Sequence, residues 1–164
     1  MFNKELKEGI IKSAKTSLEE CAKSKGNFLP VLMINSGDKK DSVLFGMANG
    51  DIDNKGDIIK QIGKQVNNMG IKVKNICMVA DTYYLKQDKK DSKMDLSVRP
   101  SQSKDRREAL TIAYQQVGDS KDVMIMLPYK RSNGGKIEWE EIPKQSKGNT
   151  VELNLLGNFW QGYI

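Results

Sequence analysis

The second half of the chain carries three successive segments with the pattern of β-strands, and the connections between them are short. Apolar and small residues alternate over residues 109–114, and residues 123–127 (VMIML) form a short apolar run. A turn sequence at 132–135 (SNGG) leads into a further alternating segment at 137–140. Strands joined by short connections usually pair as antiparallel neighbours, so this half predicts an antiparallel meander.

Two helices and three more strands are expected in the first half. Apolar residues recur at every fourth position over residues 3–24, and a similar stripe covers residues 58–69. Gly26 and Gly70 are suitable residues to end these two helices. The strands are expected at residues 27–34, 42–48 and 74–80, the last of them nearly all apolar, as in a strand buried on both faces.

These elements predict the α+β class, in the order α-β-β-α-β-β-β-β. We expect an antiparallel or mixed sheet of five to seven strands, covered on one face by the two helices. Alternating residues at 151–155 indicate one more strand. Neither a repeat nor a linker divides residues 1–164, which predicts a single domain with an aromatic tail at 156–164.

Composition excludes several chemistries. The chain of 164 residues contains no histidine, which removes Ser-His-Asp and Cys-His catalysis and zinc sites that use histidine. Cys21 and Cys77 are expected as buried free thiols, with a disulfide left open, and their spacing suits no metal site. No cofactor motif is recognised, and in particular no phosphate-binding loop.

Charge indicates a polyanion as partner. The formal net charge is +6, which favours nucleic acid or another phosphate-bearing molecule, although a lysine-rich composition can also reflect general amino-acid usage. The N-terminal residues are charged at every few positions and contain no apolar stretch of the length of a signal peptide or membrane span. We therefore expect a cytoplasmic protein that does not use a membrane.

The excess charge is concentrated in residues 86–107, a long segment with eight basic and four acidic residues and little apolar content. Long structureless insertions are usually functional or disordered. Arginine forks hold phosphate well, and serine hydroxyls can add donors. The candidate anion ligands in and beside this segment are Arg99, Ser101, Arg106 and Arg107.

Two other interpretations of this segment remain open. The arginines could pair with Asp105 or Glu108 and anchor the loop to the sheet, or the loop could simply be solvated. If a strand has already begun, Arg106 and Arg107 point to opposite faces. Aromatic residues are not interleaved with the basic ones, because Tyr83 and Tyr84 precede them, so a platform for stacking single-stranded nucleic acid is little supported.

Asp81, at the end of the apolar strand 74–80, is the second candidate. If that strand lies beside the one that starts at Glu108, the two carboxylates and the arginines converge. Such a pair could serve a metal-dependent phosphodiesterase, whereas an aspartate that caps a turn is the structural alternative. The third candidate is the C-terminal tail, where Phe159, Trp160 and Tyr163 either fold back into the core or form an interface with a second subunit.

One segment resembles a known group of proteins. The residues Arg99-Pro100-Ser101 followed by residues 105–110 (DRREAL) are similar to a segment in small uncharacterised proteins of bacteria, archaea and their viruses. The resemblance would extend over residues 1–142, with an acidic residue before aromatic ones at 81–84. It implies a viral or mobile-element origin and no activity, and it favours Asp81 and residues 99–108 as the site.

Three functions follow as hypotheses. The leading one is a non-enzymatic binding domain whose basic loop engages nucleic acid or a nucleotide-like ligand. The alternative is a structural or inhibitor protein that acts through protein contacts, as a homo-oligomer that uses the aromatic tail. The third is the metal-dependent phosphodiesterase, with Asp81 and Glu108 as its carboxylates.

Overall fold

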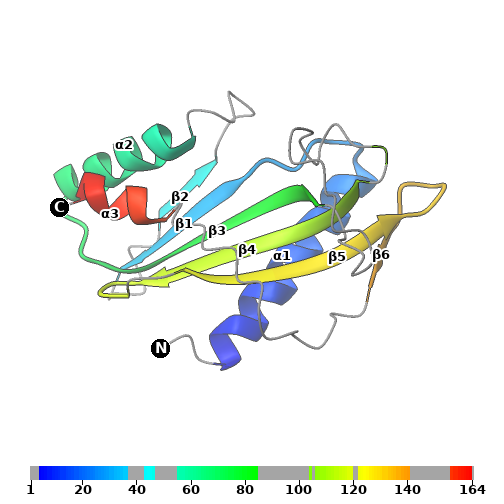
Figure 1. Cartoon of the computed structure of the whole chain (residues 1–164), viewed down its shortest axis with the longest axis horizontal. Helices are drawn as coiled ribbons and strands as arrows, with labels where there is room; N and C mark the ends of the chain where they lie inside the picture. The colour runs from blue at the N-terminus through cyan, green and yellow to red at the C-terminus, as the bar shows by residue number, and fades with distance from the viewer. Residues whose placement is uncertain are drawn as a thin grey trace, which may run out of the picture.

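The described residues form one antiparallel sheet of six strands, in the order β2-β1-β3-β4-β5-β6 (Figure 1). The computed structural model describes residues 4–36, 43–46, 55–84, 104, 106–119, 122–140 and 156–163. The strands are β1 (Val31–Ser36), β2 (Val43–Gly46), β3 (Val73–Tyr84), β4 (Arg107–Gln116), β5 (Val123–Arg131) and β6 (Ile137–Trp139). The α+β class and the antiparallel sheet expected from the sequence are confirmed, and the strand expected at 151–155 lies outside the described residues.

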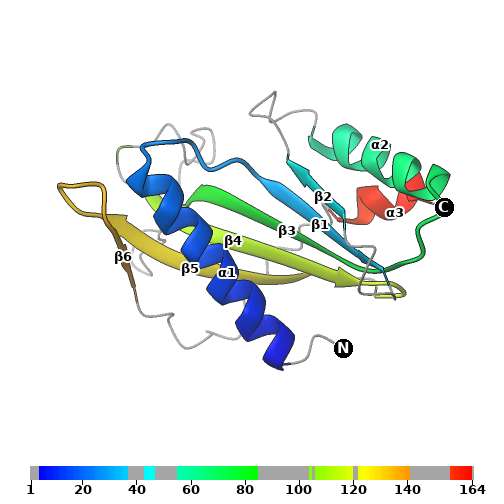
Figure 2. The ribbon, with the colours of Figure 1, turned by 180° about the vertical axis from the view of Figure 1, so that it is seen from behind.

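Within these ranges three helices accompany the sheet: α1 (Lys4–Lys23), α2 (Lys55–Asn68) and α3 (Gly157–Tyr163). They do not share one face. Helix α1 crosses one face of the sheet, in front in Figure 2, whereas α2 and α3 pack together against the other. The expectation that two helices cover a single face is therefore wrong.

Strand β3 explains why both faces are covered. Successive residues of a strand point to opposite faces. Cys77 and Val79 belong to the same buried cluster as Ile10 and Leu18 of α1, while Ile76 belongs to the cluster that includes α2 and α3. Because β3 is apolar on both sides, each face needs its own helical cover.

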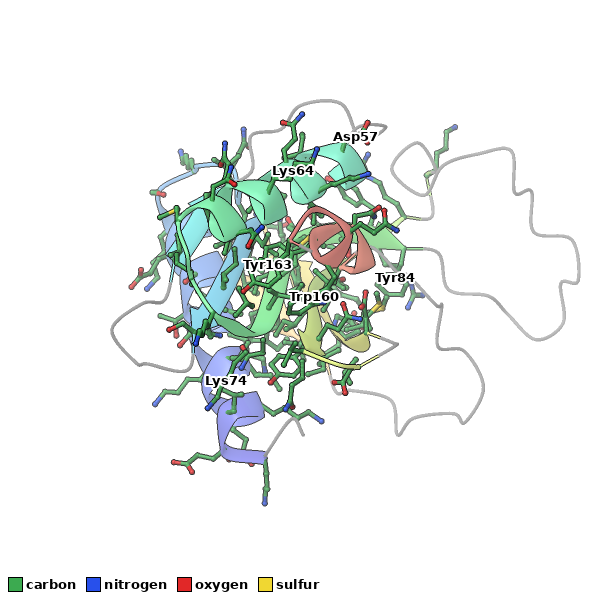
Figure 3. All side chains as sticks on the ribbon, turned by 90° about the vertical axis from the view of Figure 1, so that its left-hand side faces the viewer. Asp57, Lys64, Lys74, Tyr84, Trp160 and Tyr163 are labelled. Atoms are coloured by element: carbon green, nitrogen blue, oxygen red, sulfur yellow. The ribbon has the colours of Figure 1, made fainter. Side chains whose placement is uncertain are left out.

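The C-terminal tail forms α3 and folds back into the chain's own core. Phe159 is fully buried beside α2, and the Trp160 indole donates a hydrogen bond to the Gln115 side chain of β4 (2.8 Å). The Tyr163 hydroxyl donates to the Ile71 carbonyl (2.7 Å) and accepts from the Val73 N–H (3.2 Å). Figure 3 labels Trp160 and Tyr163 on this side of the sheet. The tail thus ties the end of α2 to the start of β3.

Helix α3 approaches α2 very closely because glycine lies on both sides of the contact. A Cβ atom added to Gly162 would overlap the Lys60 carbonyl oxygen, and one added to Gly63 would overlap the Phe159 carbonyl oxygen. Only residues without a side chain allow two backbones to approach this closely.

The two helix ends differ in how well the sequence predicts them. Gly70 follows α2 with a φ of 72°, and the next N–H, that of Ile71, bonds to the Val66 carbonyl. This is the glycine-type ending that the sequence predicts. After α1, the left-handed residue is Lys25, with a φ of 53°, and not the expected Gly26.

Cys21 and Cys77 are both free thiols, the first half-buried and the second fully buried. Burial raises the pKa of the Cys77 thiol to about 12, so this thiol stays protonated and is a poor nucleophile. Neither α1 nor any other helix among the described residues has both the length and the apolar character needed to cross a bilayer.

Candidate functional site

Four polar side chains from three neighbouring strands meet on the face of the sheet that α1 crosses. Glu108 of β4 lies directly opposite Tyr83 of β3 and Tyr129 of β5. Asp81 precedes Tyr83 by two residues and Arg131 follows Tyr129 by two, so all of them lie on the same face. The register thus brings Asp81, Glu108, Tyr129 and Arg131 together, and we call them the carboxylate network.

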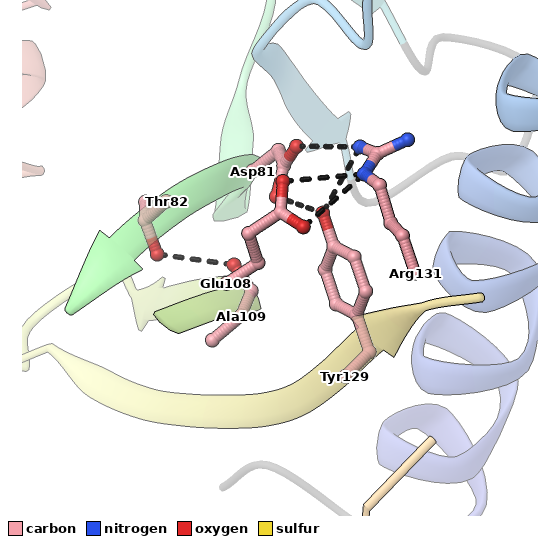
Figure 4. A network of polar contacts seen from close by, with 6 residues as sticks. All are labelled: Asp81, Thr82, Glu108, Ala109, Tyr129 and Arg131. Atoms are coloured by element: carbon pink, nitrogen blue, oxygen red, sulfur yellow. Dashed lines mark hydrogen bonds and ion pairs between the residues drawn. The ribbon is translucent and has the colours of Figure 1, made fainter. Parts of the chain in front are cut away.

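The carboxylate network is closed by short contacts (Figure 4). The Tyr129 hydroxyl donates to Asp81 Oδ1 at 2.6 Å. Arg131 Nε lies 3.2 Å from both oxygens of Glu108. Its Nη2 donates to the Tyr129 hydroxyl at 3.3 Å and lies 3.6 Å from Asp81 Oδ2. One guanidinium is therefore shared by two carboxylates and a phenol.

Burial sets the protonation behaviour of the carboxylate network. It raises the pKa of the Asp81 carboxyl above its ordinary value of 3.8, and the charge of Glu108 raises it further. The hydrogen bond from Tyr129 and the charge of Arg131 work in the opposite direction but do not cancel the effect. Burial, together with the neighbouring Asp81, also raises the pKa of Tyr129. The phenol therefore stays protonated and acts as a donor.

Trp139 of β6 connects the carboxylate network to α1. Its ring lies edge-on to Tyr129, with 5.5 Å between ring centroids. Its indole N–H donates to the Glu19 carboxylate at 2.7 Å, and the Lys15 ammonium lies 4.8 Å from the ring centroid. These contacts hold the Tyr129 ring in place from the side of α1, so both the sheet and the helix on this face support the carboxylate network.

The opposite face of the same strands carries a second, neutral contact. The Thr82 hydroxyl donates to the Ala109 carbonyl at 3.1 Å (Figure 4) and lies 2.7 Å from the Thr111 hydroxyl. Threonine pairs of this kind stabilise neighbouring strands. Side-chain contacts on both faces of the sheet therefore stabilise the pairing of β3 with β4 near Asp81 and Glu108.

The structure brings together some of the residues expected from the sequence and separates others. Asp81 and Glu108 converge, because β3 and β4 are antiparallel neighbours as the hypothesis required. Arg107 lies opposite Tyr84 and so faces the other side of the sheet. Arg106 precedes β4, with its guanidinium carbon 4.8 Å from the centroid of the Tyr83 ring. The other expected ligands, Arg99 and Ser101, lie outside the described residues.

Sequence reasoning missed the two residues that complete the carboxylate network, Tyr129 and Arg131. The arginine that pairs with Glu108 comes from β5 and lies 23 positions along the chain. One signal could have found it, because residues 129 and 131 have the same parity as Ile125 and Leu127, the residues of this strand that pack on the α1 side. That signal needs the register between β4 and β5, which the sequence does not specify.

The position of Arg131 bears on the phosphodiesterase hypothesis. A metal ion shared by Asp81 and Glu108 would have to occupy the place where the guanidinium now bridges them. Within the part of the chain that the structure describes, no cluster of three or more Asp, Glu, Cys or His residues could hold a metal ion. The arrangement is that of an ion-pair network which joins three strands, and nothing in it favours metal chemistry.

The tail residues proposed for an interface lie within the fold. Phe159 has no exposed area, while Trp160 and Tyr163 are partly buried and bonded to the sheet and to the segment before β3. The sequence left two alternatives open for the tail, and in this structure the tail folds back into the chain's own core. Phe159 could contact a second subunit only if α3 left its place.

Comparison of the chain with models of known protein families, with curated proteins and with solved structures gives no match. Any function must therefore be inferred from the chemistry of the described residues.

The raised pKa of Asp81 predicts how stability changes with pH. At a pH between the ordinary pKa of 3.8 and the raised pKa of the folded state, Asp81 is protonated in the folded state and ionised in the unfolded state. Asp81 therefore lowers the free energy of unfolding as pH rises through this range. Asp81→Asn removes this dependence but keeps an oxygen that can accept from Tyr129. Relative to wild type, we expect the variant to gain stability as pH rises from about 3 to about 7, measured by urea unfolding. A difference that is flat, or that falls with pH, would contradict the assignment.

Proposed function

We propose that this protein is a non-enzymatic binding domain that engages a phosphate-bearing partner, nucleic acid or a nucleotide-like ligand, through basic residues where the chain enters β4. Lys104, Arg106 and Arg107 are all exposed there. We call these three residues the basic entry. They are the described end of residues 86–107, which carry eight basic residues against four acidic ones.

The observation that carries the proposal is the exposure of the three cationic side chains of the basic entry. Arg131 belongs to the carboxylate network, where its Nε contacts Glu108 and its Nη2 contacts Tyr129 and Asp81. Arg106 is exposed, and its guanidinium carbon lies 4.8 Å from the centroid of the Tyr83 ring. Planar guanidinium groups at an exposed position suit phosphate recognition.

The test is a titration with a labelled nucleic acid and with a nucleotide at low salt. Binding to nucleic acid should weaken steeply as salt increases, because phosphate contacts release counterions. The double substitution Arg106→Gln and Arg107→Gln should weaken it at least tenfold and reduce the salt dependence by about two ions. No binding to single strand, duplex or nucleotide at low salt would refute the proposal.

A matched control separates a site from general charge. Lys7→Gln with Lys12→Gln removes the same two positive charges from exposed positions on α1. If binding is local to the basic entry, this control should lose much less affinity than the arginine variant. An equal loss in both would mean that the partner responds only to net charge, and the site assigned to the basic entry would be wrong.

A further inference from the structure

Tyr83 is an exposed aromatic residue at the same end of the sheet as the basic entry. Its side chain is 42% exposed, although it lies in β3, near the middle of the strand order. The sequence places no aromatic residue among the basic ones, yet pairing of β3 with β4 brings Arg106 over the Tyr83 ring. A tyrosine and an arginine that are distant in the sequence thus form one cation–π pair.

We propose that the partner is single-stranded nucleic acid and that one base joins the stack formed by Tyr83 and Arg106. The inference depends on the function proposed above. A base presents a flat π-face, which stacks on tyrosine rings and on guanidinium planes alike. In a duplex both faces of each base are covered by neighbouring bases, so this pair would gain little there.

The surroundings of Tyr83 fit a strand that lies along this end of the sheet. Lys104 and Arg107 add exposed positive charge where the chain enters β4, with Arg107 on the face of the sheet opposite Tyr83. Glu108, directly opposite Tyr83, would repel a phosphate, but it is paired with Arg131 through both carboxylate oxygens. The carboxylate network therefore reduces the repulsion that an isolated acidic residue would cause next to the stack.

The experiment compares a labelled single-stranded 20-mer with the duplex of the same sequence, by fluorescence anisotropy at one low salt concentration. We expect tighter binding of the single strand. Tyr83→Leu should weaken its binding roughly tenfold, with little effect on duplex binding and an unchanged salt slope, because stacking contributes affinity without releasing counterions. Tyr83→Phe keeps the ring and should bind nearly as wild type.

Arg107→Gln is the companion variant. It removes one charge without touching the Tyr83 ring, so it should lower the salt slope by about one. Unfolding by urea checks that each variant is folded, and the exposure of Tyr83 predicts that it will be.

The outcomes separate the two proposals. Salt-dependent binding in which Tyr83→Leu equals wild type, or in which the duplex binds as tightly as the single strand, would overturn the stacking inference and leave the phosphate-binding function in place. Absence of binding to every nucleic acid and nucleotide at low salt would overturn both.

Discussion

Replacing Gly162 with alanine is expected to lower the free energy of unfolding by about 3 kcal/mol, the upper end of what overpacking usually costs. The added Cβ would overlap the Lys60 carbonyl oxygen, which belongs to the backbone of α2 and cannot rotate away. The helices would have to separate, and α3 would lose contacts of the fully buried Phe159. Urea unfolding followed by tryptophan fluorescence measures the effect, since Trp160 lies in α3.

Gly9→Ala is the matched control for this experiment. Gly9 lies inside α1, and a Cβ atom there would meet nothing within 4 Å. Because alanine favours helix more than glycine does, the control should gain up to about 1 kcal/mol. The same chemical change thus has opposite signs at the two positions. If Gly162→Ala is as stable as wild type, the close approach of α2 and α3 is wrong.

The strands were predictable because their apolar residues either alternate or form short runs between turn residues, and short connections favour antiparallel neighbours. The prediction that both helices cover one face was wrong, although the apolar residues of 74–80 indicate cover on both faces. A strand that is apolar on both faces needs cover on both, and here Cys77 faces α1 while Ile76 faces α2 and α3. The prediction of one covered face is inconsistent with this two-sided apolar pattern.

Helix α3 could not be expected from local sequence. Its seven residues (GNFWQGY) include two glycines and only one turn of apolar side chains, and helix propensity alone would not form it. The helix exists because Phe159 and Tyr163 pack against α2, and because glycine at 162 lets the two backbones meet. Such tertiary causes leave little trace in a single sequence.

The candidate site was predictable only in part. Asp81 and Glu108 flank the connection between two strands that could be expected to pair, so their approach follows from topology. Arg131 is different, because a shift of one residue in the register between β4 and β5 would place it on the other face. The register that pairs Glu108 with Tyr129 is therefore what decides whether Arg131 meets the carboxylates.

Arg131→Met is the second substitution with a large expected effect, a loss of about 2 kcal/mol in the free energy of unfolding. It leaves Asp81 and Glu108 side by side without their shared cation, and each of these carboxylates is only 22% exposed. The loss is less than for a fully buried pair, because the arginine side chain is 39% exposed and water partly screens the charges. Urea unfolding at neutral pH measures it.

Lys130→Met on the same strand is the control. It removes the same charge, but the Lys130 side chain is 74% exposed, and its ammonium forms a 3.5 Å ion pair with Glu140. Exposed pairs of this kind contribute less than about 1 kcal/mol. If both variants lose the same stability, the carboxylate network contributes no more than an ordinary surface charge.

A second substitution identifies the cause of the loss. Glu108→Gln in the Arg131→Met background removes one of the two carboxylates that would repel each other, so the double variant should be more stable than Arg131→Met alone. Added salt should narrow that difference, because it screens the repulsion. In a double-mutant cycle the two changes should therefore be strongly non-additive. Additive losses would mean that Glu108 and Arg131 act independently, and the carboxylate network would then not be energetically coupled.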